Sequence, residues 1–120
     1  YKINQKNILG HSDIAPARKK DPGEKFPWEY LAKKKIGIWY SLPKKTLINK
    51  RKQKINNLDK KKFIQNLYKL GYPNDNNSTK TKYLKILTTA FQRRFRQKLI
   101  NGVIDQECFI ISKNLVKKFK

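Results

Sequence analysis

The sequence predicts an α+β fold in which a short strand and a long loop precede a small all-α unit of three helices. The run NILG, Asn7 to Gly10, is apolar and ends in glycine, as in a buried strand that leads into a loop. From residue 58 onward, three segments carry apolar residues at spacings of three and four, so each presents one apolar face. Three short helices of this kind must pack on one another to be stable, which predicts a helical bundle.

The loop extends from His11 to Pro27, where three prolines and a glycine argue against regular structure. Pro27 suits the start of a helix, and the segment WEYLAKKK after it has apolar residues at helical spacing and lysines toward its C-terminal end. Gly37 is expected to end this helix. In the apolar segment that follows, Trp39 is expected to pack back on the helix, which is favoured over a ligand-stacking role.

Residues 42–57 contain many lysines and arginines and no apolar period, which indicates a basic linker. The first bundle helix is predicted from FIQNLYKLGYP, with Gly71 and Pro73 marking its end. The turn NGVID separates the second and third helices, and Asp105 is placed to cap the third. The residues expected to face inward are Phe63, Ile64, Leu67 and Leu70, then Leu84, Leu87, Ala90, Phe91 and Phe95, then Phe109, Ile110, Leu115, Val116 and Phe119. On the second helix, the side chains expected mostly in solvent are Lys85, Arg93, Arg94 and Arg96.

The composition is strongly basic, with 30 Lys and Arg against 8 Asp and Glu and a formal net charge of +22. Such a charge attracts nucleic acid, anionic lipid or acidic wall polymers, although a general bias toward Lys, Asn, Ile and Tyr would produce it equally well. The single cysteine, Cys108, excludes an internal disulfide and is expected to be a small buried residue. No apolar run approaches the roughly 20 residues of a membrane span, and no signal-peptide pattern opens the chain.

The loop holds the candidate chemistry. Catalytic zinc is held by three protein ligands, commonly His and carboxylate, and keeps a fourth position for water. His11 and Asp21 could supply two of these ligands, and Lys19 lies two residues before Asp21, where a turn could aim its ammonium at a developing oxyanion. Spacing alone leaves two interpretations open: half of a metal centre, or a surface His with an Asp that caps the loop or pairs with lysine.

The string GHSDIAPARKKDPG, followed by FPWEYLAKKKIGIWY, resembles the C-terminal part of the catalytic domain of zinc-dependent N-acetylmuramoyl-L-alanine amidases of the amidase type 2 family. The family pattern is close to G-H-S-D-I-A-P-G-R-K-x-D-P-G followed by F-P-W, and Ala17 departs from it where Gly is usual. The resemblance implies an α/β catalytic fold in which His11 and Asp21 bind zinc and Lys19 stabilises the oxyanion. It also implies a substrate, the amide joining N-acetylmuramic acid to L-alanine of the stem peptide.

The second half resembles the three-helix peptidoglycan-binding domain often appended to such amidases, through FIQNLYKLGY, LTTAFQRRFR and NGVID. Asn101 stands where that family's turn has its first Asp. The resemblance therefore implies three parts: residues 1–41 as the C-terminal part of an amidase catalytic domain, residues 42–57 as a basic linker, and residues 58–120 as a peptidoglycan-binding-like domain.

The family's other zinc-binding His and its catalytic Glu precede the part that this sequence matches, and the sequence opens on Tyr1 rather than Met. We therefore expect the C-terminal remnant of an amidase, with weak or no zinc binding by itself and a separate N-terminal half as a possible partner. Asp13 and Glu24 are candidates for a substitute base, although the resemblance places the base elsewhere.

The leading function hypothesis is thus a peptidoglycan hydrolase fragment acting on peptidoglycan or muropeptides in the bacterial cell envelope or periplasm, with the cytoplasm as the alternative location. A non-catalytic cell-wall-binding module is the second hypothesis, and a basic nucleic-acid-binding protein the third. Nucleic acid is not the expected partner, because the aromatic residues of QRRFRQK and its surroundings occupy helix-core spacing rather than free positions for base stacking.

Overall fold

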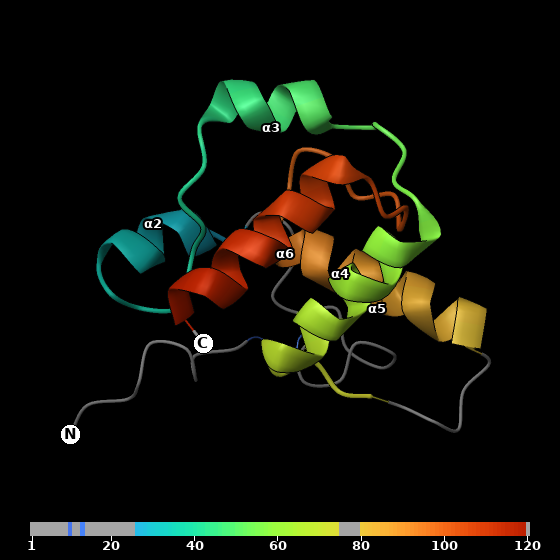
Figure 1. Ribbon diagram of the computed structural model, residues 1–120. Coiled ribbons are helices and arrows are strands. Elements are labelled where there is room, and N and C mark those ends of the chain that lie inside the picture. Colours follow the sequence, from blue (N-terminus) through green and yellow to red (C-terminus); the bar gives the residue numbers. More distant parts are fainter. Residues whose placement is uncertain (1–9, 11–12, 14–25, 75–79, 120) are drawn as a thin grey trace.

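The computed structural model describes residues 10, 13, 26–74 and 80–119, and the regular structure in these ranges is entirely α-helical (Figure 1). The prediction of an α+β fold with part of an α/β domain is therefore wrong for the described residues. Apart from Gly10, the strand predicted at Asn7 to Gly10 lies outside them. A strand needs a partner strand for its backbone groups, whereas a helix satisfies these groups within its own segment. The apolar segment around Ile38 is likewise irregular and packs against the helices.

Five helices make up the described fold, with α6 at its centre. They are α2 (Trp28–Lys33), α3 (Lys44–Lys50), α4 (Asn57–Lys69), α5 (Lys80–Phe95) and α6 (Gln106–Phe119). Helix α6 packs against α4 and α3, and its C-terminal end lies next to α2 (Figure 1). No helix in these ranges is both long and apolar enough to cross a bilayer.

Local sequence signals explain where the long helices begin and end. The Asn56 side chain accepts a hydrogen bond from the backbone N–H of Asp59 at 2.8 Å and so caps α4. Asp105 caps α6 in the same way, through a 3.0 Å bond from the backbone N–H of Cys108. The predicted cap at Asp105 is confirmed. Helix α4 ends just before Gly71, which has a φ of +107°, a conformation that suits glycine.

The core is aromatic at its centre. The rings of Phe63 and Phe91 meet edge to face with 5.2 Å between their centroids, and Phe91 and Phe95 lie 5.1 Å apart. Burying a phenylalanine side chain contributes about 1.5–3 kcal/mol, so this trio joins α4 to α5 strongly. The predicted core positions Phe91 and Phe95 are confirmed. The remaining buried hydrophobic residues of this core are Ile38, Leu47, Leu67, Tyr72, Tyr83, Leu87, Ala90, Cys108, Ile111 and Leu115.

The buried stripe of α6 differs from the prediction. Cys108, Ile111 and Leu115, at positions i, i+3 and i+7, are fully buried. Phe109 and Ile110 only pack partly against the core. Hydrophobicity alone favours the larger Phe and Ile, whereas the cap at Asp105 fixes the helix phase and places Cys108 inward. Cys108 is confirmed as a small buried residue.

Part of the predicted basic linker is a packed helix. Helix α3 occupies Lys44–Lys50, and its Leu47 belongs to the core. At the end of α3, the Arg51 guanidinium donates two hydrogen bonds to the Glu107 carboxylate of α6, at 2.9 and 3.0 Å. One apolar residue and one arginine fork therefore fix this segment to α6, although its composition alone indicates a solvated connector.

We expect Cys108 to resist thiol reagents in the folded protein. Burial, the largest cause, raises the pKa of its thiol to about 12, so the reactive thiolate is scarce at neutral pH and the sulfur is shielded as well. Labelling with a disulfide reagent at pH 8 should be slow in buffer and fast in concentrated guanidinium, where the pKa returns to about 8.5. Because Cys108 is the chain's single cysteine, rapid stoichiometric labelling of the folded chain would contradict its placement.

Candidate functional site

The predicted zinc ligands His11 and Asp21 lie outside the described residues, as do Lys19 and Glu24, but the loop is described at Gly10 and Asp13. The backbone N–H of Asp13 donates to the carbonyl of Gly10 at 3.1 Å. In return, the backbone N–H of Gly10 donates to Oδ2 of Asp13, also at 3.1 Å. The two residues that flank His11 and Ser12 in the sequence are thus bonded to each other in both directions.

The Asp13 carboxylate is buried, 4% exposed, and both of its oxygens accept hydrogen bonds from the helical part of the protein. The Tyr72 hydroxyl donates to Oδ1 at 2.6 Å, and Nη1 of Arg94 donates to Oδ2 at 2.8 Å. Burial, followed by the nearby Asp13 charge, raises the pKa of the Tyr72 hydroxyl well above its ordinary value, so this hydroxyl remains a donor. We name Gly10, Asp13, Tyr72 and Arg94 the Asp13 clamp.

Asp13 is therefore poorly placed to act as a substitute base. A general base needs an oxygen within reach of the proton that it takes, directly or through one water. Both oxygens of Asp13 are instead occupied by donors, and the side chain is shielded from solvent. The carboxylate acts as the acceptor in a structural contact, so the structure gives no support to the catalytic alternative considered for Asp13.

Arg94 connects three segments of the chain. Besides the ion pair with Asp13, its guanidinium lies over the Trp28 ring of α2, 4.1 Å from the centroid, a cation–π contact. A Cβ atom at Gly37 would come within 3.3 Å of Nη2 of Arg94, so the chain after α2 also passes close to this guanidinium. Arg94 is 2% exposed, and its predicted position in solvent is wrong.

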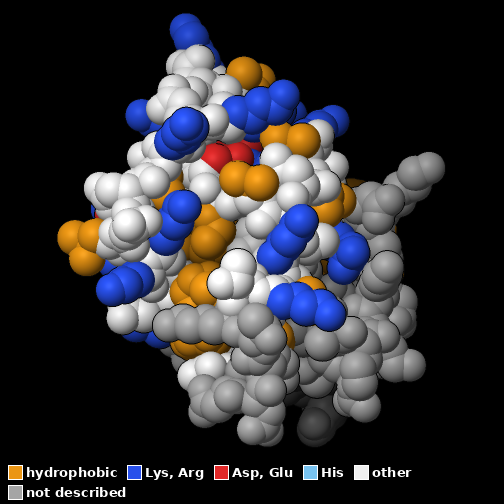
Figure 2. Space-filling view, turned by 90° about the vertical axis from the view of Figure 1, so that its right-hand side faces the viewer, with side chains coloured by type: hydrophobic (Ala, Val, Ile, Leu, Met, Phe, Trp, Pro, Cys, Tyr) orange, Lys and Arg blue, Asp and Glu red, His pale blue; other side chains and the backbone are white. Residues whose placement is uncertain are grey.

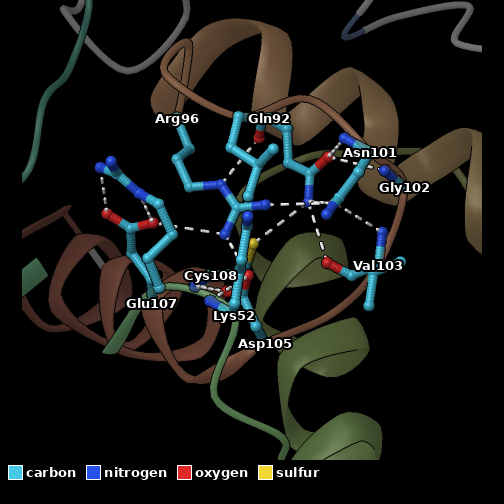
Figure 3. Close-up of polar contacts among 11 residues, drawn as sticks. Lys52, Gln92, Arg96, Asn101, Gly102, Val103, Asp105, Glu107 and Cys108 are labelled. Atoms are coloured by element: carbon cyan, nitrogen blue, oxygen red, sulfur yellow. Dashed lines mark hydrogen bonds and ion pairs between the residues drawn. The ribbon is translucent and has the colours of Figure 1, made fainter. Parts of the chain in front are cut away.

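Arg96, also predicted in solvent, is 2% exposed and belongs to a second buried cluster (Figure 3). Its Nη1 pairs with the carboxylates of Asp105 and Glu107, at 3.3 Å in the second case. Glu107 also pairs with Arg51, so two arginines face two acids. A buried arginine is tolerated only with such partners, because an isolated charge in a protein interior is strongly unfavourable.

Gln92 connects this cluster to the turn before α6. Its side-chain oxygen accepts from the backbone N–H groups of Asn101 and Gly102, both at 2.9 Å, while its Nε2 donates to the carbonyl of Val103 at 3.0 Å (Figure 3). Gly102 has a φ of +71°, and a Cβ there would come within 2.9 Å of Lys85 Cγ. The glutamine of the A-F-Q motif and the glycine of the N-G turn thus have a structural role. The sequence predicts the turn but does not indicate the bonds that Gln92 makes to it.

A hollow of about 280 Å³ lies where α2 meets the end of α6. Trp39 stacks on Tyr40 along its wall, with 4.7 Å between ring centroids, and Trp39 also lies 5.6 Å from Phe95. The ammonium of Lys118 donates to the Trp39 carbonyl and to the Ser41 hydroxyl. Lys118 therefore holds residues 39–41 against α6. Trp39 packs on α5, and it also lines the hollow next to α2.

Metal binding has no support within the described ranges, where no group of three His, Cys, Asp or Glu side chains comes together. Zinc is commonly bound by imidazole and carboxylate groups, and His11 and Asp21 would supply one of each. Zinc therefore remains a proposal that depends on these two residues.

Sequence spacing could have found one of the missed residues. The buried face of α5 contains Leu87, Ala90 and Phe91. Arg94 follows Phe91 by three residues, a helical spacing that puts it on the same face. Arg94 was predicted to lie in solvent only because its side chain is charged. Tyr72, which follows the end of α4, had no comparable signal, because a single aromatic residue in a turn shows no periodicity.

Comparisons with known proteins agree with the motifs. The chain is 33% identical over 119 residues to N-acetylmuramoyl-L-alanine amidase AmiD of Escherichia coli (strain K12), covering 99% of this chain and 43% of that protein. The structure of that AmiD in complex with the substrate anhydro-N-acetylmuramic acid-L-Ala-D-gamma-Glu-L-Lys matches with a TM-score of 0.83 at 32% identity, over 98% of this chain and 45% of that chain. No family model matches the chain.

A second solved relative is AmpDH3 from Pseudomonas aeruginosa, with a TM-score of 0.76 and 32% identity over 96% of this chain and 45% of that chain. It is also known in complex with anhydromuramic pentapeptide. The family resemblance predicted from the motifs is confirmed: over nearly its whole length, this chain is similar to part of the N-acetylmuramoyl-L-alanine amidases. It spans less than half the length of the relatives that it matches.

Proposed function

We propose that this chain is the C-terminal part of a peptidoglycan amidase that hydrolyses the amide between N-acetylmuramic acid and L-alanine. The observation that carries the proposal is the match to AmiD, which extends through both the loop motif and the helical bundle at a TM-score of 0.83. The proposed substrates are peptidoglycan or its muropeptides, and the proposed location is the cell envelope of a bacterium.

In this proposal, His11 and Asp21 hold a zinc ion and Lys19 faces the oxygen on which negative charge develops. Zinc, when bound, lowers the pKa of a coordinated water so that hydroxide forms near neutral pH. The ammonium of Lys19 would stabilise the oxyanion of the tetrahedral intermediate, as preorganised donors do in other acyl-transfer sites. The further zinc ligand and the general base would come from an N-terminal half, in the same protein or as a separate partner.

The division into residues 1–41, 42–57 and 58–120 is part of the same proposal, with the last part as a peptidoglycan-binding-like domain. Support comes from the three long helices α4, α5 and α6, which share one aromatic core. Basic side chains are spread over the face in Figure 2, where acidic atoms are confined to one small patch, and such a surface suits an anionic wall polymer. Binding to the wall without hydrolysis is the alternative function.

We expect hydrolysis to require both halves. The chain should be tested alone and after assembly with the N-terminal half of a homologous amidase, using anhydro-N-acetylmuramic acid tripeptide and mass spectrometry of the released peptide. Alone, the chain should bind zinc weakly, because only two ligands are available, and release little peptide. The assembled protein should bind zinc stoichiometrically and release peptide that begins with L-alanine.

The matched controls are the assembled proteins with His11→Ala or Asp21→Ala, each of which should lose both zinc and activity. An assembled, zinc-loaded protein that leaves the amide intact while still sedimenting with purified peptidoglycan would instead establish the wall-binding alternative. Tight stoichiometric zinc binding by the chain alone would show that it holds a complete ligand set and would contradict the proposal of a partial site.

A further inference from the structure

The Asp13 clamp joins segments that are far apart in the sequence. Tyr72 is 59 residues and Arg94 is 81 residues from Asp13, yet both donate to its carboxylate. Tyr72 follows the end of α4, and Arg94 lies in the last turn of α5. The buried side chain of Asp13 thus attaches the loop both to α5 and to the segment that follows α4.

The clamp also fixes the loop locally. Asp13 is bonded to Gly10 through its backbone N–H and its Oδ2, so the two ends of the tetrapeptide 10–13 are held together. His11 lies between these ends in the sequence. A constraint on both flanks of a residue limits where its side chain can be directed, and the residues that orient metal ligands in this way strongly affect metal binding.

We propose that Asp13 is a positioning residue that uses Arg94 and Tyr72 of the helical bundle to orient the loop carrying His11. The inference rests on the proposed function only where it takes His11 to be a zinc ligand. On this view, the bundle is more than an appended wall-binding module, because its α5 arginine holds the residue that closes the tetrapeptide 10–13. The same guanidinium contacts Trp28, so α2 is fixed to the same point.

Asp13→Asn is the sharpest change available. Asn keeps the size of the side chain, but replaces one acceptor oxygen with an N–H donor and removes the charge opposite Arg94. If the amide oxygen keeps its bonds to Gly10 and Arg94, the amide nitrogen faces Tyr72, whose hydroxyl must then accept instead of donate. In either orientation of the amide, the ion pair with Arg94 is lost. Tyr72→Phe is the milder change, because it removes one donor and leaves the ion pair with Arg94 intact.

The experiment uses the full chain and follows its single histidine by heteronuclear NMR at one fixed pH, first without metal and then during titration with zinc chloride. The matched control is Glu107→Gln, which makes the same acid-to-amide change in a buried ion pair outside the clamp. Circular dichroism and urea unfolding establish that each variant is folded and how much stability it has lost.

We expect Asp13→Asn to move the His11 ring signal and to weaken zinc binding roughly 10-fold or more, the typical cost of losing a group that orients a metal ligand. Tyr72→Phe should produce a smaller change of the same kind, and Glu107→Gln should leave the His11 signal in place even if it destabilises the fold. A His11 signal that is unchanged in both clamp variants would overturn the inference. So would a shift of equal size in Glu107→Gln, because that would reflect general destabilisation.

The metal-free and zinc measurements separate this inference from the proposed function. If the His11 signal responds to the clamp variants but zinc leaves it unchanged even when this chain, isotope-labelled, is assembled with the N-terminal half, the clamp positions the loop and the assignment of His11 as a zinc ligand fails. If zinc shifts the His11 signal with the same affinity in the wild type and in both clamp variants, His11 is a ligand and the positioning role of Asp13 is wrong.

Discussion

Replacing Arg96 with alanine is expected to lower the free energy of unfolding by about 3–5 kcal/mol, the usual loss when one partner of a buried ion pair is removed. The substitution would leave the carboxylates of Asp105 and Glu107 facing each other, both buried, with only the partly exposed Arg51 to balance them. It would also disturb the cap of α6, because Asp105 is that cap. A loss of this size is a large share of the 5–15 kcal/mol that holds a typical domain together.

Urea unfolding of the full chain, followed by circular dichroism, measures the loss. Arg93→Ala is the matched control: it removes an arginine from the same helix, but one that is only half-buried, and it should cost less than about 1 kcal/mol. Equal losses for the two variants would show that the Arg96 cluster contributes no more than helix propensity and side-chain packing do.

Replacing Lys19 with alanine in the assembled amidase is expected to lower the rate of hydrolysis roughly 10²- to 10³-fold, the loss typical of removing one oxyanion-stabilising donor. The metal should remain, because Lys19 is proposed to face the substrate oxygen and not the zinc ion. The diagnostic result is therefore stoichiometric zinc by elemental analysis together with a low kcat. His11→Ala and Asp21→Ala should lose zinc and rate together.

Lys20→Ala provides the comparison for bulk charge, since it removes the adjacent ammonium from the same basic loop. Its rate should stay within a few-fold of that of the unmodified protein. If Lys19→Ala and Lys20→Ala reduce the rate equally, or if Lys19→Ala keeps the full rate, the oxyanion role is wrong and Lys19 contributes only charge or loop structure.

The helical half of the fold follows closely from the sequence because its apolar spacing, its caps and its glycine stops agree with one another. The C-terminal end of α4, the start of α6 and the core role of Phe63, Phe91 and Phe95 needed no tertiary information. The short helix α3 was missed, since it buries only Leu47 among lysines. One buried apolar residue in a helix of seven gives no periodic signal.

The exposure of the arginines was predicted from their charge, and for two of them this was wrong. Arg93, Arg94 and Arg96 are neighbours with the same chemistry, yet one is half-buried and two are buried, according to whether an acid lies opposite. Those acids, Asp13 and Asp105, come from distant or irregular segments. Residue type alone therefore predicts exposure poorly when the partner is nonlocal.

The positions of the acidic residues determine how the stability of this basic protein depends on ionic strength. Of its eight Asp and Glu residues, three (Asp13, Asp105 and Glu107) are withdrawn into arginine pairs in the interior. Because each of these acids is matched by an arginine, the interior is close to neutral and the excess of positive charge lies on the rest of the chain. Counterions screen exposed charges over about 10 Å at 0.1 M ionic strength but reach buried pairs far less. Dissolved ions therefore relieve the repulsion among the surface lysines while the internal pairs keep their strength, so the folded chain gains from an electrolyte that weakens proteins held by surface ion pairs.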